Sequence, residues 1–152
     1  MPHPFKKEWT AALKAGTAVV VGIDPGVRTG VSFYYPGEHR VHSFTADILE
    51  AMDAVAKEHK QMTIFVNIEN PNLRRWYGQT SREVLQGAGS IKRDYSVWVS
   101  FLEREGIPFA EIAPKDVGQL TPALARKLTA KKRTSIHERD AICMALKKPL
   151  LL

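Results

Sequence analysis

The strongest constraint on the fold is a run of consecutive apolar and β-branched residues near the start of the chain. It extends from Thr17 to Ile23 (TAVVVGI), and Asp24, Pro25 and Gly26 follow it directly. Apolar residues at successive positions, rather than at alternate ones, are typical of a strand buried on both faces. Because proline cannot continue the hydrogen-bonded ladder, we expect the strand to end at Asp24. The run therefore predicts an α/β protein whose sheet is flanked by helices.

Sequence patterns predict the remaining strands and helices. Further strands are expected over residues 30–35, 40–45, 61–68 and 107–112. Helical spacing of apolar residues predicts a helix that begins at Asp47. Capping-box patterns predict two more helices, one from Thr80 to about residue 105 and one from Ser135 to about residue 147.

The resulting order is β-β-β-α-β-α-β-α. Three strands in close succession predict an antiparallel meander, and helical crossovers predict that the later strands run parallel to the first. A mixed five-stranded sheet of this kind, flanked by helices, is the pattern of the ribonuclease H-like fold. The 152 residues are the length of a single domain. Residues 1–16 are an N-terminal extension, either an extra helix or, the favoured interpretation, a surface appendage, and residues 149–152 form an apolar tail.

Composition excludes several classes of protein. The single cysteine rules out a disulfide framework and a metal cluster held by several cysteines. No apolar run approaches the roughly 18 residues of a membrane span, and the basic start lacks the apolar stretch of a signal peptide. We therefore expect no membrane association and a cytoplasmic protein, in a bacterial cell or in a bacteriophage-infected host.

Positive charge is concentrated at the end of the chain. The net charge is +6; residues 1–114 hold 13 basic and 13 acidic side chains, whereas residues 115–152 hold 9 basic and 3 acidic ones. A localised basic stripe suggests a polyanionic partner, with a solvated surface as the alternative. Lys131, Lys132 and Arg133 come just before the last predicted helix, where they are expected to contact phosphates.

Two carboxylates are expected at one edge of the sheet. Asp24 ends the first predicted strand and Glu69 ends the fourth. If these parallel strands are neighbours, they lie about 4.8 Å apart and both side chains emerge at the carboxyl edge, where open α/β sheets bind ligands. Carboxylates this close repel one another unless a cation neutralises them, and Mg²⁺ commonly takes one or two carboxylates together with substrate phosphate.

His137 and Asp140 extend this set. They lie three positions apart in the last predicted helix and so project from one face. For His137 a purely structural role is the alternative, and Glu138 is assigned only to the capping box. Three carboxylates and an imidazole beside a basic stripe suit two-metal phosphodiester hydrolysis, in which the ions lie about 3.5–4 Å apart.

Short motifs in this chain resemble those of RuvC-type Holliday junction resolvases over roughly residues 18–147. The opening motif is Val21 to Gly26 with Thr29-Gly30, and Ile68-Glu69 resembles the second acidic position. The segments Leu85 to Gly89 and Glu111 to Pro114 with Val117 resemble the middle of the family, and His137 to Ala141 resembles its C-terminal motif. The Lys-Lys-Arg-Thr before His137 and the short chain look more like the bacteriophage-encoded branch.

This resemblance implies a homodimeric endonuclease that makes paired nicks in a four-way DNA junction, with roles in DNA recombination and repair. It implies Mg²⁺, for which Mn²⁺ can substitute, with two ions per active site. Asp24, Glu69, His137 and Asp140 are the implied catalytic and metal-binding residues. The long helix after Gly89 is the implied dimer element, and a helicase partner is unknown. Gly87 and Gly89 suggest close packing there, because each costs about 1 kcal/mol in a helix.

The chain departs from the family pattern at two places. The family has a lysine after the proline-valine segment, for which Lys115 is the candidate here. It also has an aromatic residue shortly after the second acidic position, where this chain has Asn72 and Leu73. Aromatic side chains that stack on bases are worth about 1–3 kcal/mol each. The expected DNA-binding residues are Arg74, Arg75, Trp76, Tyr77, Arg82, Lys92, Arg93, Lys115, Lys131, Lys132 and Arg133, with a loop-anchoring role as the alternative for Trp76 and Tyr77.

Other functions compete with a junction resolvase. A binding module that kept the fold but lost catalysis is disfavoured, because acidic groups facing phosphate would only weaken binding. An actin-like ATPase or sugar kinase also has an Asp-x-Gly phosphate loop but needs two such domains, more than this chain can supply. A nuclease for RNA in a hybrid, for replication forks or for flaps stays open.

Overall fold

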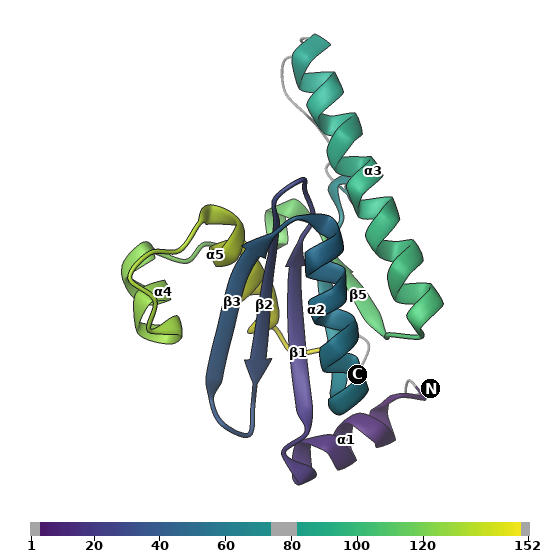
Figure 1. Cartoon of the computed structure of the whole chain (residues 1–152), viewed down its shortest axis with the longest axis vertical. Helices are drawn as coiled ribbons and strands as arrows, with labels where there is room; N and C mark the ends of the chain where they lie inside the picture. Colours follow the sequence, from purple (N-terminus) through teal and green to yellow (C-terminus); the bar gives the residue numbers. More distant parts are fainter. Residues whose placement is uncertain (1–3, 74–81, 150–152) are drawn as a thin grey trace.

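A computed structural model describes residues 4–73 and 82–149, without the side chains of residues 82–88. Within these residues the chain forms a mixed five-stranded sheet in the order β3-β2-β1-β4-β5 (Figure 1). β1, β2 and β3 are antiparallel neighbours, whereas β4 and β5 run parallel to β1. The predicted meander and parallel strands are therefore confirmed. The strands are β1 (Ala18–Asp24), β2 (Thr29–Tyr35), β3 (Arg40–Ala46), β4 (Thr63–Glu69) and β5 (Phe109–Ile112).

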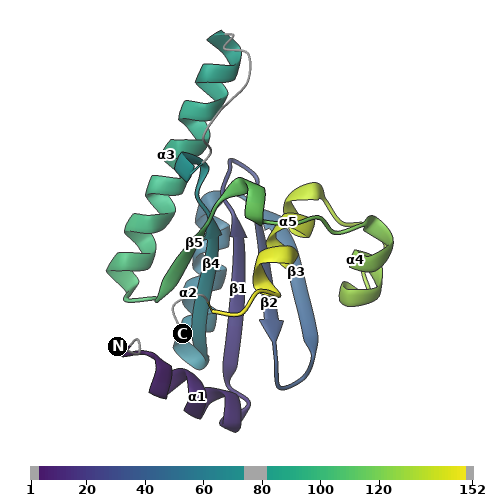
Figure 2. The same cartoon turned by 180° about the vertical axis from the view of Figure 1, so that it is seen from behind.

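β1 is buried along its whole length because helices cover both faces of the sheet. α2 (Ile48–Gln61) and α3 (Arg82–Glu105) lie on one face, and α5 (Ile136–Ala145) lies on the other (Figures 1 and 2). Successive strand residues alternate between faces. Val19, Val21 and Ile23 thus join the core under α2 and α3, whereas Gly22 faces α5. Asp24 has the same parity as Gly22 and therefore points to the α5 face.

The backbone of α5 lies directly on β1 and β2. A Cβ atom at Gly22 would come within 1.9 Å of the carbonyl oxygen of Ala141, and one at Gly30 would come within 2.1 Å of that of His137. Only glycine leaves room for this approach. The glycines of the opening motif therefore bring the first turn of α5 down onto the sheet beside Asp24.

The N-terminal segment forms a helix, α1 (Lys6–Ala15), that belongs to the core. Trp9 is 6% exposed, and its ring lies edge-on to that of Phe65 at 6.4 Å. Ala12 and Val20 complete this cluster on the α5 side of the sheet. The extra helix is confirmed, but the interpretation as a surface appendage is wrong, because this helix covers strand residues that would otherwise be exposed.

Some strands and helices begin or end a few residues from their predicted positions, and some short elements were not predicted. α4 (Pro122–Thr129) was not predicted, although Thr121 caps it and Pro122 occupies its first turn. Short 3-10 turns, η1 (Pro71–Leu73) and η2 (Pro114–Asp116), follow β4 and β5. The predicted cap at Thr80 lies outside the described residues. No helix in the described part of the chain is long and apolar enough to cross a membrane.

Candidate active site

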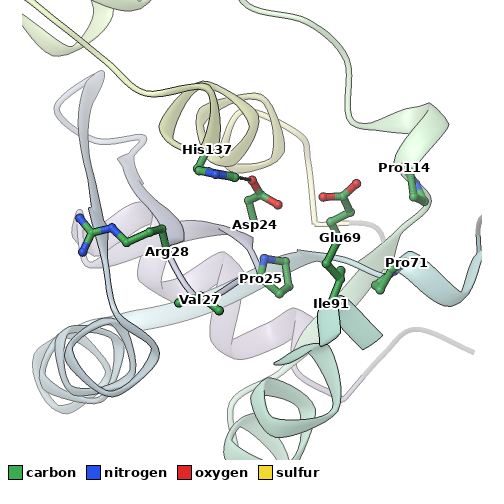
Figure 3. Close-up of a pocket in the computed structure, with 10 residues that line it drawn as sticks. Asp24, Pro25, Val27, Arg28, Glu69, Pro71, Ile91, Pro114 and His137 are labelled. Carbon is green, nitrogen blue, oxygen red and sulfur yellow. Dashed lines mark hydrogen bonds and ion pairs between the residues drawn. The ribbon is translucent and has the colours of Figure 1, made fainter. Parts of the chain in front are cut away.

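Asp24 and Glu69 lie across from one another at the carboxyl edge of the sheet. Each is the last residue of its strand, and β1 pairs with β4 in parallel, with Ile23 opposite Ile68. Because both residues have the parity of the α5 face, their carboxylates emerge on the same side. Figure 3 shows the two groups facing each other across a gap. The adjacency expected from the sequence is therefore confirmed.

These carboxylates border a pocket of about 420 Å³. The β1–β2 loop, the end of β4, α3 and the start of α5 all contribute to its wall. The lining residues are Asp24, Pro25, Gly26, Val27, Arg28, Glu69, Pro71, Ile91, Pro114 and His137 (Figure 3). The pocket thus collects side chains from distant parts of the sequence at the edge where open α/β sheets bind ligands.

His137 is held against Asp24. Its Nδ1 lies 2.8 Å from Oδ2 of Asp24, and its side chain is 46% exposed whereas that of Asp24 is 10% exposed. Ser135 is the N-cap residue of α5 and forms a capping box with Glu138, so the helix begins at Ile136. His137 therefore lies in the first helical turn. The close approach at Gly30 then brings that turn to the carboxylate. The histidine therefore reaches the site expected for it, and its ring remains partly open to solvent.

The surroundings of Asp24 favour its protonated form. The pKa of Asp24 is raised to about 6: burial is the main cause, a hydrogen bond with the Glu69 side chain opposes it, and the negative charge of Asp140 adds to it. A carboxylate in such a position is destabilised when ionised, unless a cation lies close to it. The site therefore favours binding of positive charge between Asp24 and Glu69.

Asp140 lies at a second pocket, of about 480 Å³, which Glu69 and Pro114 also border. Burial raises the pKa of Asp140, whereas the nearby His137 and Arg139 lower it. Glu69 therefore stands between two hollows, with Asp24 and His137 on one side and Asp140 on the other. The four predicted residues meet at one edge, but in two adjoining pockets.

The oxygen donors at this edge fit a hard divalent cation. Within the described part of the chain, no group of three or more His, Cys, Asp or Glu side chains is arranged so that it could hold a metal ion. Mg²⁺ does not require such a cage, because it keeps several waters and takes one or two carboxylates together with substrate phosphates. The facing carboxylates of Asp24 and Glu69 are ligands of this kind.

The predicted DNA-binding residues are placed only in part. Arg74, Arg75, Trp76 and Tyr77 lie outside the described residues, as does the side chain of Arg82. Lys92 and Arg93 lie on α3, where Arg93 donates a hydrogen bond to Ser90 Oγ. Lys115 is exposed in η2, next to the pocket residue Pro114.

The basic segment before α5 divides into two kinds of side chain. Lys132 and Arg133 are exposed. Lys131 instead forms an ion pair with the buried Glu138, with 2.7 Å between Nζ and Oε2. The three neighbouring cations thus do not share one environment.

Arg28 and Ile91 border the first pocket although the sequence did not single them out. Arg28 is in the loop after Asp24 and donates toward the carbonyl oxygen of Thr45 at 3.5 Å. Its position between the motif residues Asp24 and Gly30 is the sequence feature that could have indicated a place at the site. Ile91 gave none, because an exposed apolar residue in a long amphipathic helix is ordinary. At Gly89 a Cβ atom would meet nothing within 4 Å, so packing within the described part of the chain does not explain that glycine.

Comparison with solved structures identifies the fold. The chain is similar to T. thermophilus RuvC in complex with Holliday junction substrate, with a TM-score of 0.59 and 17% sequence identity over 85% of this chain and 90% of that one. The chain matches no protein-family model and none of the curated sequences compared with it. The likeness establishes a ribonuclease H-like fold of the RuvC type, and the expected fold class is therefore confirmed.

Proposed function

We propose that this protein is a divalent-metal-dependent endodeoxyribonuclease that cleaves branched DNA, with the four-way junction as its substrate. The observation that carries the proposal is the pair of facing carboxylates, Asp24 and Glu69, at the sheet edge, with His137 bonded to the first of them. The structural neighbour of this chain is a RuvC protein with a Holliday junction substrate. That likeness supports the choice of substrate, and the carboxylates support the choice of chemistry.

Asp24 and Glu69 would hold Mg²⁺, and Asp140, which lines the adjoining pocket together with Glu69, would help to hold a second ion. When bound, such ions supply Lewis-acid activation of the attacking water and of the leaving oxygen. Asp24 must give up its proton for this role, and a cation between the two carboxylates would favour the ionised form of both. His137 orients the Asp24 carboxylate through Nδ1, and its exposed ring can take or deliver a proton at Nε2.

The basic surface supplies the contacts to DNA phosphates, which do not depend on the base sequence. Lys132 and Arg133 are exposed next to the helix that carries His137, so they can bind phosphates close to the cleaved bond. Such contacts release counterions, and binding should therefore weaken steeply with salt. Lys92, Arg93 and Lys115 are further candidates, and Arg74, Arg75, Trp76, Tyr77 and Arg82 remain predictions from the sequence.

Paired nicks require two copies of the site, so the proposal includes a homodimer. α3 extends well beyond the body of the sheet (Figure 1), and Ile91 and Val97 on it are each 44% exposed. These features make α3 a suitable surface for contact with a partner subunit. A cytoplasmic location, in a bacterial cell or an infected host, and the bacteriophage-like branch are the expectations from the sequence that complete the proposal.

Cleavage of a panel of labelled DNAs tests the proposal. The wild-type protein with Mg²⁺ is expected to nick a four-way junction in preference to a Y-fork and a linear duplex, and Asp24→Asn is expected to bind the junction without cutting it. No cleavage of any substrate by the wild type, with binding retained, would make the protein a binding module. If the fork or the linear duplex were cleaved as fast as the four-way junction, the protein would be a less selective nuclease rather than a junction-specific one.

A further inference from the structure

Glu138 is a buried carboxylate that the proposed chemistry does not use. It is 6% exposed, although it lies in the first turn of α5, directly after His137. Its capping-box role does not require burial, because an exposed glutamate can reach back to the N-cap backbone equally well. Burying a carboxylate is costly unless charge and hydrogen bonds compensate it. The surroundings of Glu138 therefore call for a second explanation.

Both carboxylate oxygens of Glu138 are engaged. Oε2 accepts hydrogen bonds from Lys131 Nζ at 2.7 Å and from Ser43 Oγ at 2.9 Å. Oε1 accepts longer ones from Thr45 Oγ1 and from the backbone N–H of Ser135, each at 3.5 Å. Burial raises the pKa of Glu138, but the hydrogen bonds from Lys131 and Ser43 outweigh it and hold the pKa below its ordinary value. The residue is thus a satisfied, ionised carboxylate.

Lys131 attaches the loop before α5 to the edge strand β3. Its Nζ donates to the carbonyl oxygen of Ser43 at 3.1 Å as well as to Glu138. Its backbone N–H donates to Thr129 Oγ1, and Ala130 before it has a left-handed backbone with φ of 59°. The Lys131 ammonium is therefore engaged by Glu138 and by the backbone of β3, although 38% of the side chain remains exposed.

These contacts fix the first turn of α5 in two directions. The glycine at position 30 sets how closely His137 approaches the sheet. The bonds from Glu138 and Lys131 to Ser43 set its position along the sheet, because they join α5 to β3. A displacement of about 1 Å in a catalytic group can cost about a hundred-fold in rate.

We propose that Glu138 and Lys131 are a positioning pair that holds His137 against Asp24, and that Lys131 acts through this contact rather than by binding phosphate. The inference rests on the proposed nuclease function and refines the part played by the basic segment. Lys132, its exposed neighbour, keeps the role of a phosphate contact. The two lysines thus have different roles although they are adjacent in the sequence.

A matched pair of variants separates these roles. In Ca²⁺, which permits binding without cleavage, Lys132→Met is expected to lower the slope of log Kd against log salt by about one. Lys131→Met is expected to leave that slope as in the wild type while slowing single-turnover cleavage in Mg²⁺ about ten-fold or more. If Lys131→Met lowered the slope as much as Lys132→Met does, the inference would be overturned while the nuclease proposal stayed intact.

A spectroscopic measurement tests the pair without DNA. The ¹⁵N chemical shifts of the His137 ring report its hydrogen bond to Asp24. In Glu138→Gln they are expected to move toward the values found in Asp24→Asn. Unchanged shifts in a folded Glu138→Gln protein would reduce Glu138 to a contributor to stability, whether or not the protein cleaves DNA.

Lys131→Met leaves the Glu138 charge buried and unpaired, which can prevent folding. The double variant Lys131→Met/Glu138→Gln removes both charges together and serves in its place. It should fold, show displaced His137 ring shifts and cleave slowly. A double-mutant cycle with His137→Ala completes the test, because a pair that acts through His137 adds no further loss once that ring is gone. Additive losses would contradict the proposal.

Discussion

The Nδ1 atom of His137 lies 2.8 Å from Oδ2 of Asp24, although 113 positions separate the two residues in the sequence. The contact joins the end of the central strand to the first turn of α5. It depends on glycines that let the helix backbone rest on the sheet and on the polar contacts that tie the helix start to β3. Several consequences of this arrangement can be measured.

Substitution of His137 tests whether the contact serves catalysis. We expect His137→Ala to slow Mg²⁺-dependent cleavage of a four-way junction by about 10²-fold, because a positioned proton-transfer group contributes that much. Junction affinity in Ca²⁺ should stay near the wild-type value, since Lys132 and Arg133 remain exposed. Full cleavage activity in this variant would return His137 to a structural role.

The raised pKa of Asp24 predicts how stability depends on pH when metal is absent. Its pKa is about 6 in the folded protein against an ordinary value of 3.8, so between these values the folded state binds more protons than the unfolded chain. Stability should therefore fall as the pH rises through this window and stay lower above it. The loss is at most about 3 kcal/mol, since each pKa unit is worth about 1.4 kcal/mol.

Urea unfolding in EDTA at about pH 4 and about pH 7.5 measures this effect. Asp24→Asn lacks the titrating group and should lose less stability over the same range. Mg²⁺ should raise the melting temperature of the wild type at neutral pH more than that of Asp24→Asn, because a ligand that binds only the folded state stabilises it. The same pH dependence in both proteins would contradict the raised pKa of Asp24.

Gly30→Ala tests the close approach of α5. A Cβ atom there would lie 2.1 Å from the carbonyl oxygen of His137, so the helix must move. We expect a loss of about 1–3 kcal/mol in the free energy of unfolding, as for other overpacked sites, and slower cleavage. Gly89→Ala is the matched control, because a Cβ atom there meets nothing within 4 Å. That change should stabilise the chain by about 1 kcal/mol, and equal effects of both substitutions would argue against the described packing.

Trp9→Ala tests the place of α1 in the core. Trp9 is buried against Phe65, and removing a ring of this size usually costs about 3–5 kcal/mol. We expect a large drop in melting temperature, measured by circular dichroism. A change close to zero would instead indicate that this segment is a surface appendage.

The sheet was predictable because its signals are local. The uninterrupted apolar residues of β1 require cover on both faces, and the short connections before and after β2, residues 25–28 and 36–39, leave room only for a meander. The adjacency of Asp24 and Glu69 followed from strand direction alone. α4 was not predicted although Thr121-Pro122 is a helix-start signal, because the helix is short and its Arg126 and Lys127 also fit an exposed basic surface.

The contacts between distant segments could not be predicted from the sequence. Lys131 was interpreted as one of three equivalent phosphate contacts, but its partner Ser43 lies 88 positions away on β3. Glu138 was recognised as the capping partner of Ser135, and its burial became visible only with the strand packed beside it. The division of the acidic residues between two pockets likewise depends on the loop that follows β5.

The most direct test of the nuclease site is the Mg²⁺-dependent, single-turnover cleavage of a four-way junction by the wild type, Asp24→Asn and Glu69→Gln. The wild type is expected to nick the junction, and each variant should be slower by about 10²–10³-fold, because each removes one of the two facing carboxylates that would hold the metal. Junction binding in Ca²⁺ provides the control for folding. A wild type that cuts no junction, or variants that cut it at the wild-type rate, would contradict the assignment of this edge as a metal-dependent nuclease site.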